Sequence, residues 1–283
     1  MATFATSDQL LVIIDPAARQ ADGESVRIAK DVLSAGATAK VCLPEGPEEF
    51  ARALGRRGSR RPVVIGDDRA LVRAVTLLHR RRELAGCALA MVPVGDTALA
   101  QSLGVPGGTV AAARAVLDGA ERRLDLLVDD SDGVVLGALG IPPAPVRGVA
   151  AEPVAVPAGR PWLRTTYRSL VRTLAPRPTR LSAVPSPGPA RLRVEVDGET
   201  VVDLDQPVEA VSVTPRTGGV ASVEVRHLSV GAEATPVLAS GRTVTVVGAD
   251  FRYRADAAVS GPVRRRTWTV REDAWSLTLP AGR

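Results

Sequence analysis

Residues 62–70 read PVVIGDDRA, an apolar run that ends in a glycine and two aspartates. A continuous apolar run of this length is typical of a parallel strand that is buried on both faces. Residues 70–84, which follow at once, have the apolar spacing of an amphipathic helix. The sequence therefore predicts a buried strand, a tight turn at Gly66, Asp67 and Asp68, and then a helix.

The same order of strand and helix repeats on both sides of this unit. Further strands are predicted at residues 10–14, 39–43 and 88–92, and further helices at residues 23–35, 48–54 and 109–118. Strands that alternate with helices favour a parallel sheet covered by helices. We therefore expect residues 1–140 to form a three-layer, Rossmann-like α/β domain.

The second half of the chain has a different pattern. Residues 142–161 are rich in Pro, Ala and Val and are interpreted as the crossing between domains, followed by a short helix at 161–174 and a loop at 176–189. Beyond them, turn residues separate strand-like segments at 192–196, 208–213, 221–227, 243–247 and 267–270. This pattern predicts an antiparallel, β-sandwich-like domain over residues 141–283, with a cleft between the two domains. A continuous sheet that spans both halves would contradict this prediction.

Composition restricts the classes of partner. The chain has 283 residues, enough for two domains, and a formal net charge of +5, which favours anionic partners such as nucleotides and anionic lipid headgroups. Aromatic residues make up only 3%. The chain therefore lacks the aromatic side chains on which single-strand nucleic-acid binders stack bases, and nucleic acid is set aside as a partner. Its two cysteines, Cys42 and Cys87, lie in hydrophobic stretches and are expected to be buried thiols.

The chain shows no sequence signal for membrane insertion. No apolar run reaches the ~18 residues that span a bilayer. The N-terminus lacks the basic region and long apolar run of a signal peptide. We expect a cytoplasmic protein that can meet a membrane from its surface.

An ordered series of segments resembles the diacylglycerol kinase family, which also includes bacterial lipid kinases and sphingosine kinases. That family has a G-G-D-G-T loop after a strand, and residues 65–69 here read IGDDR. A P-L-G-T-G-N-D-F-A-R loop follows the next strand in the family, and residues 93–106 here read PVGDTALAQSLGVP. The segments RRLDL at residues 122–126 and RVEVDGE at residues 193–199 resemble later family segments, and Asp15-Pro16 resembles an N-P turn.

The resemblance implies transfer of the γ-phosphoryl group of ATP to a lipid hydroxyl, with ATP and Mg²⁺ as cofactors and a lipid as substrate. It implies nucleotide contacts at Gly66, Asp67, Arg69, Gly95 and Asp96, because glycines let backbone amides approach phosphate. It also implies catalytic roles for two carboxylates. Asp67 would help to hold the metal–nucleotide pair, and Asp256 would accept the proton of the lipid hydroxyl. The acids near Asp256 are scattered, and no metal site can be assembled from them.

Several positions depart from the family pattern. Asp68 replaces a loop glycine and adds negative charge where phosphate would sit, although Arg69 could compensate. The second loop is one residue short and lacks its Asn-Asp pair, and Ala258 stands where a partner acid is expected. The earlier Asp197-Gly198-Glu199 also reads D-G-E, but its place between two strands favours a hairpin turn.

Three hypotheses follow from this pattern. The first is an active lipid kinase with slow turnover, and the second is a catalytically inactive pseudo-kinase that binds lipid, nucleotide or a protein partner. The third is an unrelated Rossmann-like enzyme, which is disfavoured because no G-x-G-x-x-G follows the first strand. Association into a homodimer also stays open.

Overall fold

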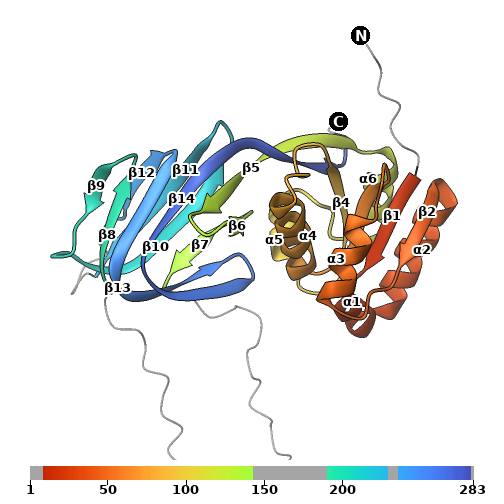
Figure 1. Cartoon of the computed structure of the whole chain (residues 1–283), viewed down its shortest axis with the longest axis horizontal. Coiled ribbons are helices and arrows are strands. Elements are labelled where there is room, and N and C mark those ends of the chain that lie inside the picture. The colour runs from red at the N-terminus through yellow and green to blue at the C-terminus, as the bar shows by residue number, and fades with distance from the viewer. Residues whose placement is uncertain (1–8, 143–189, 229–234, 282–283) are drawn as a thin grey trace, which may run out of the picture. The chain divides into compact units, whose positions relative to one another are not determined.

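The computed structural model describes residues 9–142, 190–228 and 235–281. In the first of these segments, each of the strands β1–β4 is followed by one or two helices, and three strands follow α6 (Figure 1). The elements are β1 (Gln9–Ile14), α1 (Pro16–Ala21), α2 (Gly23–Gly36), β2 (Thr38–Cys42), α3 (Pro47–Gly55), β3 (Arg61–Gly66), α4 (Asp68–Arg80), β4 (Ala88–Pro93), α5 (Ala98–Ser102), α6 (Thr109–Asp118), β5 (Ala120–Asp129), β6 (Val134–Val135) and β7 (Leu139–Ile141).

The remaining described residues form strands alone. They are β8 (Ala190–Val196), β9 (Glu199–Val202), β10 (Pro207–Arg216), β11 (Val220–His227), β12 (Val237–Gly241), β13 (Thr243–Ala255) and β14 (Ala258–Leu279). The crossing from residue 143 on, the helix predicted at 161–174 and the loop predicted at 176–189 lie outside the described residues.

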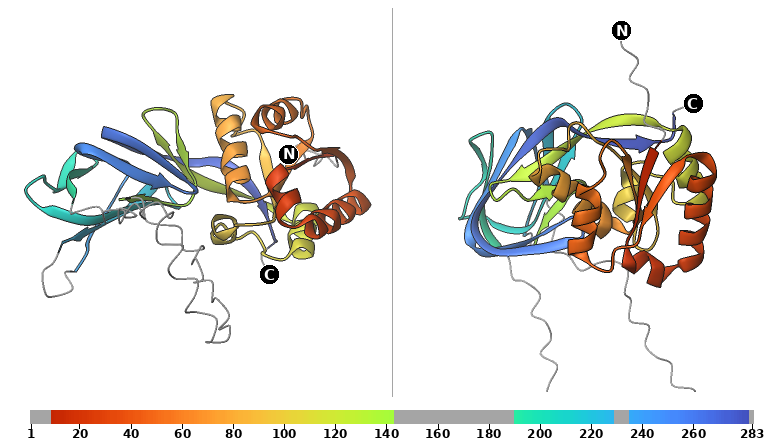
Figure 2. Two further views of the ribbon diagram at one scale, coloured as in Figure 1. Left: turned by 90° about the horizontal axis from the view of Figure 1, so that it is seen from below. Right: turned by 45° about the vertical axis from the view of Figure 1, so that its right-hand side comes forward.

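Four strands of the first segment pair in parallel, in the order β2-β1-β3-β4. Helices α2 and α6 pack together on one face of these strands, and α3 and α4 lie on the other (Figure 2). Because both faces are covered, the apolar runs of β1, β3 and β4 are almost fully buried. The strand predicted at residues 62–65 and the helix predicted from residue 70 are confirmed as β3 and α4.

The β-rich part is antiparallel, with β10 paired to β11, β11 to β12, and β13 to both β8 and β14. Residues 197 and 198 form the β8–β9 hairpin turn, with φ of 51° at Asp197 and 88° at Gly198. This confirms the prediction of a turn there, because such turns need positive φ at both central residues.

The prediction that the two halves have separate sheets is wrong. Strand β14 pairs with β13 and β5, and near its end it also pairs in parallel with β4 through Ser276↔Ala88 and Leu277↔Leu89. One hydrogen-bonded sheet of 14 strands therefore runs through both parts. The alternating pattern of this strand stops at residue 270, because the register shifts between Arg271 and Trp275.

The sheet is continuous, but the apolar side chains form two cores. The first surrounds the parallel strands and also contains Trp275, Leu277 and Leu279 from the end of β14. The second fills the β-rich part and contains Leu139 and Ile141 of β7, which pairs with β10 and β13. Within the described residues, no helix is long and apolar enough to cross a membrane.

Candidate functional site

The turn after β3 is built around a glycine that cannot carry a side chain without rearrangement. A Cβ atom on Gly66 would lie 2.7 Å from the Cβ of Ala70 and 3.1 Å from the Cβ of Asp15. The end of β3, the start of α4 and the end of β1 therefore meet at this residue. Asp67 follows as the N-cap of α4, and its Oδ1 accepts a hydrogen bond of 2.9 Å from the backbone N–H of Ala70.

The turn after β4 lies against the turn after β3. The N–H of Val94 donates to the carbonyl of Gly66 at 2.8 Å, and the N–H of Asp68 donates to the carbonyl of Asp96 at 2.9 Å. Gly95 has φ of +97°, and a Cβ atom there would lie 3.6 Å from the Cβ of Asp67. The two predicted loops thus meet at the carboxyl ends of β3 and β4, where open parallel sheets bind ligands. Arg69 is exposed beside them and makes no hydrogen bond or ion pair with the described residues.

The sequence had suggested that Asp68 is an unpaired charge in this turn, but the structure shows otherwise. Asp68 is buried, its Oδ2 accepts from the N–H of Leu99 at 2.7 Å, and its Oδ1 accepts from the N–H of Ala100 at 2.9 Å. Burial raises the pKa of Asp68, and the nearby charges of Asp96 and Asp67 raise it further, against the two amide hydrogen bonds. The carboxylate joins α4 to α5, a role that its position in the sequence pattern did not reveal.

Asp256 occupies the turn between β13 and β14, with φ of 47°. Its Oδ2 accepts from the N–H of Leu136 at 2.7 Å, and its Oδ1 accepts from the N–H groups of Gly137 and Ala138 at 2.8 and 3.1 Å. Burial raises its pKa, and the charge of Asp68 adds to that effect. The turn between β13 and β14 therefore lies close enough to Asp68 for the charge of that residue to act on Asp256.

The contact that joins them passes through α5. A Cβ atom on Gly137 would lie 2.5 Å from the Cδ1 of Leu99 and 3.2 Å from the Oδ1 of Asp256. The amide of Leu99 is also one of the two bound by Asp68. Because Gly137 has no side chain, Leu99 and Asp256 can both lie close to it, and no sequence motif had pointed to this residue.

A hollow of about 330 Å³ opens at the carboxyl ends of β1 and β2. It is lined by Asp15, Pro16, Ala17, Gln20, Glu45, Gly46, Pro47 and Arg73. Buried Asp15 pairs with the Nη1 of Arg73 at 2.6 Å, and that guanidinium lies 5.5 Å from the ring centre of Phe50. The sequence pattern singled out the Asp15 turn but missed Arg73, which comes from the second turn of α4, a helix that is distant in sequence.

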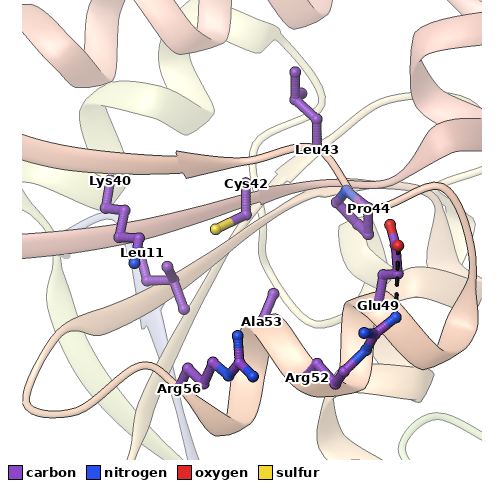
Figure 3. A pocket seen from close by; sticks show the side chains of 9 residues that line it. All are labelled: Leu11, Lys40, Cys42, Leu43, Pro44, Glu49, Arg52, Ala53 and Arg56. Atoms are coloured by element: carbon purple, nitrogen blue, oxygen red, sulfur yellow. Dashed lines mark hydrogen bonds and ion pairs between the residues drawn. The ribbon is translucent and has the colours of Figure 1, made fainter.

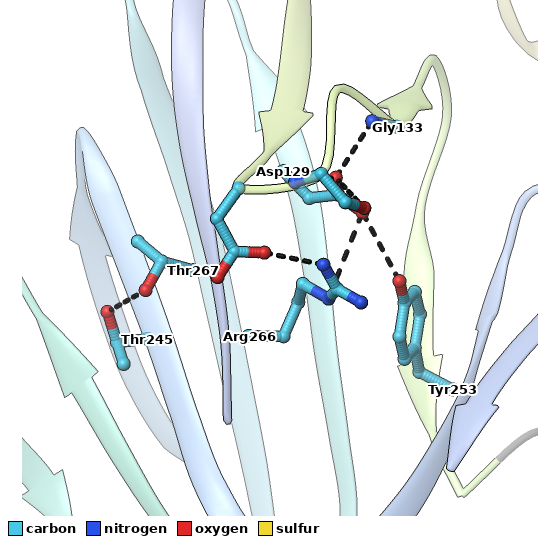
Figure 4. Close-up of polar contacts among 8 residues, drawn as sticks. Asp129, Gly133, Thr245, Tyr253, Arg266 and Thr267 are labelled. Carbon is cyan, nitrogen blue, oxygen red and sulfur yellow. Dashed lines mark hydrogen bonds and ion pairs between the residues drawn. The ribbon is translucent and has the colours of Figure 1, made fainter. Parts of the chain in front are cut away.

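A second polar cluster lies in the β-rich part (Figure 4). The Oδ1 of Asp129 accepts hydrogen bonds from the N–H and hydroxyl of Ser131 and from the N–H of Gly133, and Tyr253 donates to its Oδ2 at 3.3 Å. Burial alone would raise the pKa of Asp129, but the hydrogen bonds from Ser131 and Gly133 and the charge of Arg266 outweigh burial and lower it. Since the donors to Oδ1 all come from residues 131 and 133, this cluster stabilises the β5–β6 turn.

The raised pKa values predict an unusual dependence of stability on pH. In the native state Asp68 and Asp256 hold their protons above the ordinary aspartate pKa of 3.8. Between that pKa and the raised ones the native state binds more protons than the unfolded state, so the free energy of unfolding falls as pH rises. Asp129, with its lowered pKa, has the opposite effect below pH 3.8.

Denaturant titrations that start above pH 4.5, where the lowered pKa values of Glu24, Asp22, Asp129 and Asp203 no longer contribute, should therefore show stability decreasing as pH rises through the raised pKa values of Asp68 and Asp256. Asp256→Asn should flatten that slope, whatever its effect on absolute stability. Asp250→Asn is the control, because Asp250 is exposed in its ion pair with Arg264. If the stability of the wild type increased with pH across this range, the buried environments assigned to Asp68 and Asp256 would be contradicted.

Comparisons with known proteins show similarity in fold and no match in sequence. No protein-family model matches the chain, and no curated protein matches it in sequence. A structure from Bacillus anthracis strain Sterne, described as a "putative diacylglycerol kinase", superimposes with a TM-score of 0.69 at 14% identity, over 98% of this chain and 99% of that one. A diacylglycerol kinase structure from the same strain superimposes with a TM-score of 0.66 at 12% identity, over 96% and 97%. The chain therefore has a diacylglycerol kinase-like fold.

Proposed function

We propose that this protein binds Mg-ATP at the paired turns after β3 and β4 and transfers its γ-phosphoryl group slowly to a lipid hydroxyl. The observation that carries the proposal is the meeting of Gly66 and Asp67 with Gly95 and Asp96 at the carboxyl ends of two parallel strands. Together with the shared fold, this arrangement supports a nucleotide site at the position that the sequence motifs indicate.

The residues of these turns fit a magnesium-bound triphosphate. Asp67 uses Oδ1 to cap α4, whereas its Oδ2 accepts no hydrogen bond from the described residues, and Asp96 is exposed. Carboxylate oxygens of this kind are suitable ligands for Mg²⁺, which supplies charge neutralisation between phosphates when bound. The exposed guanidinium of Arg69 and the backbone around Gly95 would contact phosphate oxygens.

Asp256 is the candidate general base. In the transfer step the lipid hydroxyl oxygen bonds to the γ-phosphorus, the bond from that phosphorus to the β–γ bridging oxygen breaks, and ADP leaves. The hydroxyl proton goes to the carboxylate of Asp256. A raised pKa favours proton acceptance, but three backbone amides already donate to this carboxylate. Since a new proton must compete with those hydrogen bonds, we expect slow transfer.

A pseudo-kinase that binds nucleotide without transferring phosphate is the second candidate function. It is favoured by the same three amide hydrogen bonds, which satisfy Asp256 as a structural residue. Asp68 fits this reading too, because both of its oxygens are bound by amides of α5.

Radiolabelled ATP and mixed diacylglycerols and related lipids separate the two candidates. The wild type should transfer label slowly, and Asp256→Asn should reduce the rate by at least about 100-fold, the usual contribution of a general base. Asp250→Asn, which changes an exposed aspartate also at positive φ, should leave the rate unchanged. Rapid transfer that survives Asp256→Asn would overturn the assigned base, and no transfer by the wild type would favour the pseudo-kinase.

A further inference from the structure

A second groove lies beside the edge strand β2 (Figure 3). It has a volume of about 320 Å³ and is lined by Leu11, Lys40, Cys42, Leu43, Pro44, Glu49, Arg52, Ala53 and Arg56. Strand β2 pairs only with β1 among the described strands, so its outer edge carries no neighbour. The volume lies at the lower end of the range for small-molecule sites.

One stripe of α3 forms the wall of this groove. Residues 49, 52 and 53 are spaced at i, i+3 and i+4 and therefore share one face of the helix, and Arg56, the residue that caps the C-terminus of α3, lines the groove as well. Phe50 and Leu54 are fully buried in the core. Opposite this wall, Lys40 and Cys42 alternate along β2 and share one face of the strand. Cys42, which the sequence suggested was buried, is half-buried and borders the groove.

The groove carries more positive charge than its own acid can balance. Glu49 lies 3.5 Å from Arg52, and its other oxygen accepts the N–H of Glu45 at 3.0 Å. Lys40 and Arg56 are exposed and form no ion pair with a carboxylate of the described residues. Three cations and one carboxylate leave the groove with a net charge of +2, and like charges facing one space repel unless an anion lies between them.

We infer that this groove binds a phosphomonoester. A phosphomonoester carries a charge of about −2 at neutral pH, which matches the groove's excess better than the single charge of a carboxylate. Guanidinium groups such as those of Arg52 and Arg56 donate paired hydrogen bonds to phosphate oxygens. Leu11, Leu43, Pro44 and Ala53 supply an apolar surface for the carbon part of the ligand.

This site is independent of the proposed kinase activity. None of its lining residues belongs to the turns at residues 66–69 or 93–97. The phosphate could belong to a soluble metabolite or to an anionic lipid headgroup, since the recognising chemistry is the same. Exposed Leu43 at the rim would be buried further in either case.

The chain has its only two lysines at positions 30 and 40, which gives a direct test. Reductive methylation with ¹³C-formaldehyde labels every primary amine, both lysine amines among them, and keeps their charge, so each lysine reports by its own NMR signal. Lys30 is the internal control, because it lies on α2 near Asp31 and outside the groove. One titration uses glycerol 3-phosphate, and the other uses phosphatidylcholine vesicles with and without phosphatidic acid.

The Lys40 signal should shift and saturate while the Lys30 signal stays in place. Arg56→Ala should weaken binding about tenfold, the effect of losing a charge-assisted hydrogen bond, and Arg252→Ala, an exposed change in β13, should not. Saturation by glycerol 3-phosphate indicates a soluble ligand, and saturation only by phosphatidic acid vesicles indicates a headgroup. Parallel, unsaturated shifts of both lysines, no shift of Lys40 with either probe, or a Lys40 response unchanged by Arg56→Ala would overturn the inference.

Discussion

Asp256→Ala is expected to lower the free energy of unfolding by about 3 kcal/mol at neutral pH. The change leaves the N–H groups of Leu136, Gly137 and Ala138 without their acceptor, and an unpaired amide costs about 1–3 kcal/mol where it is buried. It also places alanine at φ of 47°, which costs about 1 kcal/mol. Relief of the repulsion between Asp256 and Asp68 offsets part of this loss.

Asp250→Ala separates the hydrogen-bond effect from the backbone effect. Asp250 has φ of 40°, but its ion pair with Arg264 is exposed, so its loss should cost only about 1 kcal/mol. Denaturant unfolding of both variants measures the difference. If both lost the same stability, the three amide hydrogen bonds would have no net effect, and the structural role of Asp256 would be wrong.

Gly66→Ala is expected to cost about 3 kcal/mol, at the upper end for an added methyl group in a packed site. Its Cβ would lie 2.7 Å from the Cβ of Ala70 and 3.1 Å from the Cβ of Asp15, and both of those atoms are attached directly to backbone. No flexible side chain can move aside, so α4 must shift relative to β3. That shift would also displace the Asp67 cap and the turn proposed to hold nucleotide.

Gly86→Ala is the matched control, because no atom lies within 4 Å of the Cβ that it would add. Thermal unfolding should place this variant close to the wild type and Gly66→Ala well below it. Equal melting temperatures for the two variants would show that the end of β3 tolerates a side chain and would remove the packing reason for glycine there.

The local pattern predicted the elements that bury an apolar run. Residues 62–65 read as a strand because four consecutive apolar or β-compatible residues need cover on both faces, and β3 has it. The helix at 109–118 was predicted over the same residues that α6 occupies. The contact between the turns after β3 and β4 was also predicted, since neighbouring parallel strands end at one edge of a sheet.

The contacts that could not be predicted from the sequence pattern involve partners that are distant in sequence. Asp68 looked like a charge in an open loop, because nothing local shows that the amides of Leu99 and Ala100 bind it. The resemblance implied for Asp256 only the role of a base, whereas its carboxylate oxygens accept hydrogen bonds from residues 136–138, more than a hundred positions earlier. The pairing of β14 with β4 was missed for the same reason, because the residues of one strand do not show which other strand it pairs with.

Calorimetric titration with Mg-ATP tests the proposed nucleotide site most directly. The wild type should bind one equivalent, and Arg69→Ala should bind about tenfold more weakly, because an exposed guanidinium beside the paired turns would lose a charge-assisted contact with phosphate. Arg252→Ala, an exposed change in β13, should bind as the wild type does. No heat of binding with the wild type, or an affinity that Arg69→Ala leaves unchanged, would contradict the account.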